Sequence, residues 1–255
     1  MKKNVYYQTM YSYPNPIKAF LSDLFFTICS YPRLILSVHV RKNFGERAIS
    51  LPIAISIFLL LLLLPMIQVI SPWSYRHPSL LTIIFENISW YAFTGLFLVK
   101  SWQRHKEVKR VASEFNFRKF TKYGGDLHPA FFNFKFNGKR VSIRTIETLV
   151  EPAFFLLIGI TLILFAQKIG IVISLFSLMY SLSYYIAYWR GDTIILDMID
   201  QIIANEVLFD VFTENDDRAS KDGFRVFGNA PVDPNLRSKV ANNLRGVEDE
   251  AFEVV

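Results

Sequence analysis

Cysteine is almost missing from this chain, because Cys29 is the one cysteine among 255 residues. A single thiol cannot form an intramolecular disulfide, so the fold does not depend on an oxidising compartment for covalent support. We interpret Cys29 as a buried thiol, with lipid modification of the same side chain as the alternative. The class of small disulfide-stabilised secreted domains is therefore excluded.

Clusters of catalytic and metal-binding residues are also missing. His39, His77, His105 and His128 lie in four different segments, and no two have the i, i+4 spacing of a helical metal site. A P-loop, a dinucleotide glycine fingerprint, GxSxG and HExxH are all absent. We therefore expect no metal, no cofactor and no enzyme. A membrane enzyme acting on lipid is a weaker hypothesis, since no histidine or carboxylate pair is clustered.

A cleavable secretory signal is the third absence. The first residues, MKKNVYYQTMYSYPNP, contain two lysines but no uninterrupted apolar core. We expect the first membrane span to act as an uncleaved insertion signal instead.

Long hydrophobic runs are abundant. Residues 51–70 read LPIAISIFLLLLLLPMIQVI without a charge, and a helix of that length rises about 30 Å, the thickness of the hydrocarbon core of a bilayer. Three more apolar runs follow at about 80–99, 152–168 and 171–189. Short connections after the first and third runs predict two helical hairpins. The sequence thus predicts an integral membrane protein with four transmembrane helices.

The distribution of cations predicts the orientation of these spans. Seven lysines and arginines precede the first span and twelve lie between the second and third, whereas the other short loops hold only Arg76 and Lys168. Because cations near span ends stay in the cytoplasm, both termini and the central segment are expected inside. A three-span or five-span topology would put the basic central loop or the charged tail on the wrong side.

The predicted fold class is an all-α polytopic membrane protein with four transmembrane helices, a small cytoplasmic β-hairpin and amphipathic cytoplasmic helices. We divide the chain into six segments. They are a cytoplasmic N-terminal segment with an interfacial helix (1–48), transmembrane hairpin 1 (49–100), a basic cytoplasmic segment with the β-hairpin (101–149), transmembrane hairpin 2 (150–190), a cytoplasmic amphipathic helix (191–213) and a polar, acidic, flexible tail (214–255).

Two segments outside the spans carry apolar faces. Asn15-Pro16 begins an amphipathic pattern that predicts a helix at the inner interface, or one packed on a cytoplasmic segment, ending near Tyr31-Pro32. Further along, Phe132, Phe134 and Phe136 alternate with polar residues before Asn137-Gly138, which is typical of a β-hairpin continuing through residues 141–145. A hairpin alone is marginal, so its phenylalanines need a cover: the N-terminal helix, the tail, the membrane or a partner.

Residues 193–212 continue with a helical apolar stripe that includes Ile195, Ile199 and Ile202. Such a stripe must pack against something, and the phenylalanine hairpin is the nearest candidate in the same chain. From Glu214 the composition becomes polar and acidic, with a short helix expected to begin at Asp233-Pro234.

Polar residues inside the apolar runs are the candidates for chemistry. Glu86 is an ionisable residue inside the second span, next to Asn87, and predicts an ion or proton relay or, alternatively, a protonated acid that stabilises helix packing. Ser174, Ser177 and Ser181 share one face of the fourth span and could line an aqueous path, although close helix packing is the favoured interpretation. We interpret Glu151, before Pro152, as a helix cap.

These patterns favour a non-enzymatic inner-membrane anchor or scaffold subunit. Its layout is similar to accessory proteins of secretion or conjugation machines, which is an analogy of organisation alone. The predicted docking surface comprises Phe132, Phe134, Phe136, Ile195, Ile199 and Ile202. The expected partners are other protein subunits and anionic lipid at the cytoplasmic leaflet, with a homo-oligomer as a further expectation; nucleic acid is not expected. The alternative is an oligomeric channel or transporter subunit built on Glu86.

Overall fold

The computed structural model describes residues 5–11, 16–67, 80–108, 121–214, 224–229 and 231–240. Within these ranges the protein is mostly helical, with one small antiparallel sheet of two strands. The described helices that are long and apolar enough to cross a membrane are three: Ala19–Val40, Ile143–Leu164 and Ile169–Thr213. These helices support an integral membrane protein.

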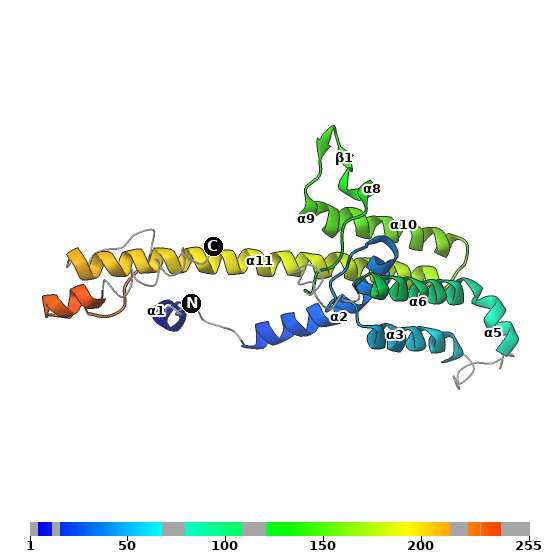
Figure 1. Ribbon diagram of the computed structural model, residues 1–255, viewed down its shortest axis with the longest axis horizontal. Helices are drawn as coiled ribbons and strands as arrows, with labels where there is room; N and C mark the ends of the chain where they lie inside the picture. The colour runs from blue at the N-terminus through cyan, green and yellow to red at the C-terminus, as the bar shows by residue number, and fades with distance from the viewer. Residues whose placement is uncertain are drawn as a thin grey trace. The chain divides into compact units, whose positions relative to one another are not determined.

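The chain divides into two compact units, residues 1–22 with 188–255, and residues 23–187. Figure 1 shows the elements in chain order by colour, and α2 and α11 contribute residues to both units.

Helix α2 (Pro16–Val40) is longer than the sequence predicts, because it continues through Tyr31-Pro32 to Val40. The prediction that it ends near Pro32 was wrong. Proline removes one backbone hydrogen bond, but the turns beyond it are held by the burial of Ile35, Leu36 and Val38. The first turns keep the predicted character, since their apolar face, which includes Ile17, Leu24 and Ile28, is exposed.

The first predicted hairpin consists of α3 (Leu51–Leu63), the 3-10 turn η1 (Leu64–Met66), α5 (Leu80–Glu86) and α6 (Ile88–Val108). Helix α3 packs against α6, and the Trp90 indole Nε1–H donates to the Leu61 carbonyl at 2.7 Å. The second apolar run is not one helix, because Asn87 interrupts it and donates its side-chain amide to the Ile83 carbonyl. Residues 68–70 and the predicted turn at 71–78 lie outside the described residues.

The second predicted hairpin consists of α10 (Glu151–Leu164) and α11 (Ile169–Glu214). Helix α10 continues the short α9 (Ile143–Thr145) and the π-helical turn η2 (Ile146–Val150), so this helical stretch begins at Ile143. Helix α11 contains 46 residues and is about 69 Å long, more than twice the thickness of a hydrocarbon core. The segment predicted as a cytoplasmic amphipathic helix, 191–213, is the second part of α11 and continues the fourth predicted span without a break.

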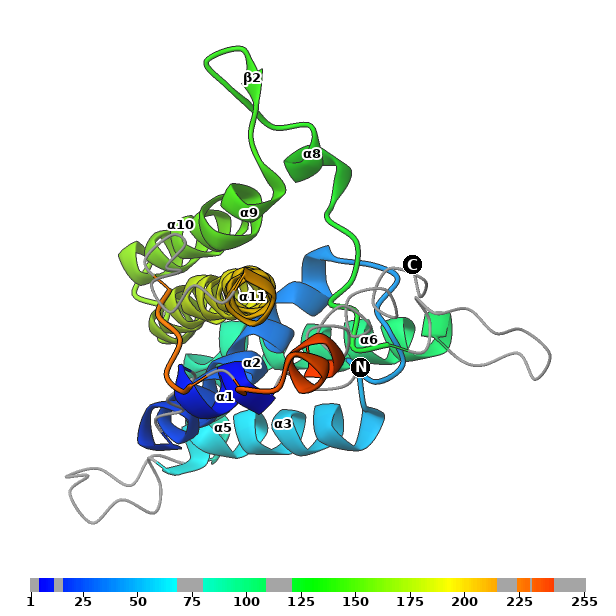
Figure 2. The ribbon, with the colours of Figure 1, turned by 90° about the vertical axis from the view of Figure 1, so that its left-hand side faces the viewer.

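The β-hairpin is present but shorter than predicted. Strands β1 (Lys135–Phe136) and β2 (Lys139–Arg140) flank Asn137 and Gly138, which both have positive φ, as a tight hairpin turn requires. Phe132 ends α8 (Pro129–Phe132) instead of lying in a strand. The second strand ends at Arg140, and soon afterwards the Ser142 hydroxyl accepts from the Thr145 amide and begins α9. Figures 1 and 2 both show the hairpin standing away from α10.

In the other unit, α1 (Val5–Met10) lies against residues 224–227, through ring contacts of Tyr11 with Phe224 and Phe227. Tyr7 donates its hydroxyl to Asp200 of α11 at 3.3 Å. Residues 234–240 form the short helix predicted after Asp233, whose carboxylate accepts from the Asn235 amide. The rest of the predicted flexible tail, 214–255, lies mostly outside the described residues.

Candidate functional site

The most concentrated set of interactions surrounds Arg41, the residue that follows α2. The chain turns sharply here, with Asn43 at positive φ, and then runs beside residues 121–126. The Gly45 amide donates to the Tyr123 carbonyl and the Asp126 amide to the Lys42 carbonyl. A side chain at Gly45 would overlap the backbone of Thr121, so only glycine permits this approach.

The Arg41 side chain is buried to 1% exposure and connects three helical segments. Its Nε donates to Glu151 Oε2 at 3.1 Å, and Nη2 makes a second contact with the same oxygen. Nη1 donates to Glu147 at 3.0 Å and to the Tyr184 hydroxyl at 2.5 Å. Such charge-assisted bonds from a planar guanidinium fix both distance and orientation.

Two pairs of residues at helical spacing supply the partners of Arg41. Glu147 and Glu151 lie four residues apart on η2 and α10, and Tyr180 and Tyr184 lie four residues apart on α11. Tyr180 donates its hydroxyl to Glu151 at 2.6 Å. The network therefore joins the end of α2 to both helices of the second hairpin.

The electrostatics favour a permanently charged Arg41. Burial by itself lowers the pKa of Arg41, but the Glu151 carboxylate, which accepts its hydrogen bonds, outweighs burial and holds that pKa above its ordinary range. The second oxygen of Glu151, Oε1, is buried without a hydrogen-bond partner among the described residues. One buried cation thus faces two carboxylates.

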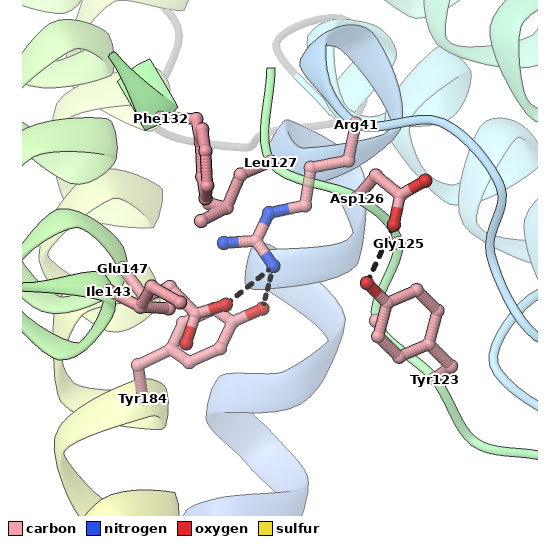
Figure 3. A pocket seen from close by; sticks show the side chains of 10 residues that line it. Arg41, Tyr123, Gly125, Asp126, Leu127, Phe132, Ile143, Glu147 and Tyr184 are labelled. Atoms are coloured by element: carbon pink, nitrogen blue, oxygen red, sulfur yellow. Dashed lines mark hydrogen bonds and ion pairs between the residues drawn. The ribbon is translucent and has the colours of Figure 1, made fainter. Parts of the chain in front are cut away.

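A pocket of about 530 Å³ opens beside this network. Figure 3 shows the Arg41 guanidinium directed toward Glu147 and Tyr184, with Phe132 and Leu127 lining the same space. On another wall, Tyr123 donates its hydroxyl to Asp126 at 2.7 Å. The described lining contains no cysteine, serine or histidine. The geometry is suited to holding helices together or accepting a small ligand.

No group of three metal-ligating side chains occurs in the described part of the chain.

The role of Glu151 differs from the prediction that it caps a helix. It lies inside a continuous helical stretch that begins at Ile143, and it pairs with Arg41.

In the sequence, Arg41 is one of seven cations before the first span, so it was not predicted as a site residue. The sequence feature that could have indicated this site is the i, i+4 spacing of Glu147 and Glu151, which Tyr180 and Tyr184 repeat. Nothing local in the sequence connects these pairs to a residue 110 positions away.

The predicted intramembrane residues do not converge on one site. Glu86 is exposed at the last turn of α5, and Asn87, which follows it, is buried and donates its side-chain amide to the Ile83 carbonyl of α5. On α11, the Ser177 hydroxyl donates to the Pro152 carbonyl and the Ser181 hydroxyl to the Thr148 carbonyl. The Ser174 hydroxyl is buried against Gly159 of α10. These contacts lie between packed helices.

The predicted docking residues are largely uncovered. Phe132, Phe134 and Phe136 are all exposed, Phe136 to 73%, and Phe132 also lines the pocket beside Arg41. Ile195, Ile199 and Ile202 of α11 are each about half exposed.

Comparison of the chain with family models, with curated proteins and with solved structures gave no match.

Proposed function

We propose that the protein is a non-enzymatic inner-membrane subunit that anchors and docks other proteins. The supporting observation is the second part of α11, where Ile195, Met198, Ile199 and Ile202 remain about half exposed. An exposed apolar stripe of this kind is typical of an interaction surface. The plasma membrane of a bacterium and a secretion- or conjugation-like machine are the setting that this layout suggests.

The proposed topology has four spans, formed by the α3 run, by α5 with α6, by α10 and by the first part of α11. Helix α2 is long enough to cross, yet it holds Asp23 and Arg33 well inside its length. Placing a charged side chain at the centre of a bilayer costs free energy, roughly 3 kcal/mol per residue on membrane-insertion scales, which give the lowest values. We place α2 at the cytoplasmic interface, where its exposed apolar face contacts lipid.

The apolar stripe of α11 fits a protein better than a lipid surface. Asp192, Asp197, Asp200, Glu206 and Asp210 lie on the same part of the helix, and the tail adds further acids. Acidic side chains are repelled by the anionic cytoplasmic leaflet. The expected partner therefore has an apolar groove with basic residues at its rim.

Affinity purification of the full chain after mild-detergent extraction tests this proposal. Co-purifying proteins at constant stoichiometry are expected with the natural chain and with I195L/I199L/I202L, which keeps the stripe apolar. The I195S/I199S/I202S variant is expected to lose them. A truncation after Thr213 shows separately what the tail contributes. A lone homo-oligomer in every preparation would contradict docking and favour a conducting assembly.

A further inference from the structure

A second pocket, of about 350 Å³, lies between α2, the loop before α3 and residues Lys122–Gly124. Three cationic side chains line it: Arg33, Arg47 and Lys122. No aspartate or glutamate is among the described lining residues, and Glu46, the chain neighbour of Arg47, is not part of the wall. The pocket therefore has a surplus of positive charge, unlike the compensated site around Arg41.

The three cations are available to a ligand. Within the described residues, none of them forms a salt bridge, because the ion pairs there join Arg41 to Glu147 and Glu151 and Arg104 to Glu107. Arg33 is held in place by aromatic rings, with Cζ 4.8 Å from the ring centroid of Tyr184 and 5.8 Å from that of Phe26. Ring contacts orient a guanidinium while leaving its N–H donors free to bind an anion.

The beginning of α3 adds neutral donors to the same pocket. Ser50 is the N-cap residue and lines the wall, and its hydroxyl makes no capping hydrogen bond. The first N–H groups of a helix have no intrahelical partner and carry partial positive charge; at the start of α3, Leu51 and Ile53 have such a group and Pro52 does not. This arrangement of cations, a hydroxyl and a helix N-terminus is complementary to a phosphate group.

We propose that this pocket binds a phosphate group, the one carried by an anionic phospholipid headgroup. The apolar side chains of Phe26, Leu34 and Ile53 line the same space, and Ile53 begins the apolar length of α3. Acyl chains can therefore extend along α3 while the phosphate contacts the cations. A soluble phosphate ester shares the headgroup chemistry but lacks this apolar contact. The inference needs only the membrane location, and it stands apart from the docking proposal.

Thermal unfolding of the purified full chain in detergent tests the site. The probes are dioctanoyl phosphatidylglycerol, the zwitterionic dioctanoyl phosphatidylcholine and free glycerol phosphate. The anionic lipid is expected to raise the midpoint of unfolding saturably, and the other two are expected to act only at much higher concentration.

Matched variants separate this pocket from general charge attraction. R47Q/K122Q removes one arginine and one lysine that are both exposed at the pocket, and K139Q/R140Q removes the same two residue types from the exposed β-hairpin. The pocket variant is expected to raise the half-effective lipid concentration by roughly 100-fold, about tenfold for each lost charge-assisted contact. The hairpin control is expected to stay within about fivefold. R33K keeps the charge but loses the planar fork, and a loss of about tenfold is expected.

Equal losses in the two double variants, or no saturable effect of phosphatidylglycerol, would overturn the site. Glycerol phosphate acting as well as the lipid, with the same sensitivity to R47Q/K122Q, would keep the phosphate site but refute the lipid as its source.

Discussion

At the scale of single residues, Arg41 shows why an arginine and not a lysine follows α2. Its guanidinium contacts Glu147, Glu151 and Tyr184 at once, which a single ammonium group on a flexible stem does not reproduce. Removing one partner of a buried ion pair leaves a charge without compensation.

Substitution of Glu151 by glutamine is expected to destabilise the protein by about 3–5 kcal/mol, since Arg41 then loses its most buried carboxylate. Thermal or denaturant unfolding in detergent measures this loss. E147Q serves as the comparison and is expected to cost less, because Glu147 is 15% exposed and reaches solvent. In R41M/E151L the buried Arg41–Glu151 pair is replaced by apolar side chains, and Glu147, which reaches solvent, keeps the remaining charge, so most of the stability should return; a double variant as unstable as E151Q would contradict this account.

Substitution of Glu86 tests the alternative hypothesis that the protein is a channel or transporter subunit. Because the Glu86 side chain makes no hydrogen bond or ion pair with a described residue, E86Q is expected to leave assembly and any ion flux of reconstituted vesicles unchanged. Loss of flux in E86Q with intact assembly would favour the channel over the docking subunit.

Tyr7 gives a prediction about pH. Burial, followed by the nearby Asp200 and Asp197, raises the pKa of Tyr7 above its ordinary value of 10.0. Below about pH 10 the hydroxyl is protonated in both folded and unfolded chains, so its stabilising contact with Asp200 is fully present. Above that pH the unfolded chain loses the proton first, and the contribution falls until the folded pKa is passed. The stability gap between the natural chain and Y7F is thus expected to close above pH 10, which unfolding midpoints across pH 8 to 11 would measure.

At the scale of elements, the contact between α10 and α11 depends on small residues. A side chain at Gly159 would overlap the Ser174 hydroxyl and come within 2.9 Å of the Gly170 carbonyl, whereas one at Gly95 of α6 would meet nothing within 4 Å. G159A is expected to destabilise by about 1–3 kcal/mol, and G95A to stabilise by up to about 1 kcal/mol. A lower unfolding midpoint in G159A and a higher one in G95A would support this close packing. An unchanged midpoint in G159A would contradict it.

The elements also show what a sequence can predict. The Asn137-Gly138 turn and the helix after Asp233 were predictable because their determinants are local. The helix through Pro32 was not, since burial of residues further along α2 outweighs the missing hydrogen bond. Similarly, Asn87 interrupts an apolar run that hydropathy alone presents as continuous. The Arg41 network was missed because it joins residues that are distant in the chain, whereas its i, i+4 pairs were visible.

At the scale of the whole molecule, the proposed topology places both termini in the cytoplasm. Reporter fusions at the N-terminus and after Val255 are expected to show cytoplasmic activity, and a fusion near residue 75 the opposite. If α2 crosses the membrane in addition to the four proposed spans, the N-terminal reporter lies outside while the C-terminal one stays inside. The N-terminal fusion therefore separates the two arrangements.

The separation of Arg41 from Glu151 also has a consequence for biosynthesis. The two residues are 110 positions apart, and ribosomes add about 5–20 residues per second, so Arg41 emerges roughly 5–20 s before its carboxylate. During that interval the nascent chain carries a cation whose compensation has not yet been made. Fragments that stop before Glu147 keep this cation without Glu147 or Glu151, and the newly made protein reaches its final packing only after the second hairpin is synthesised.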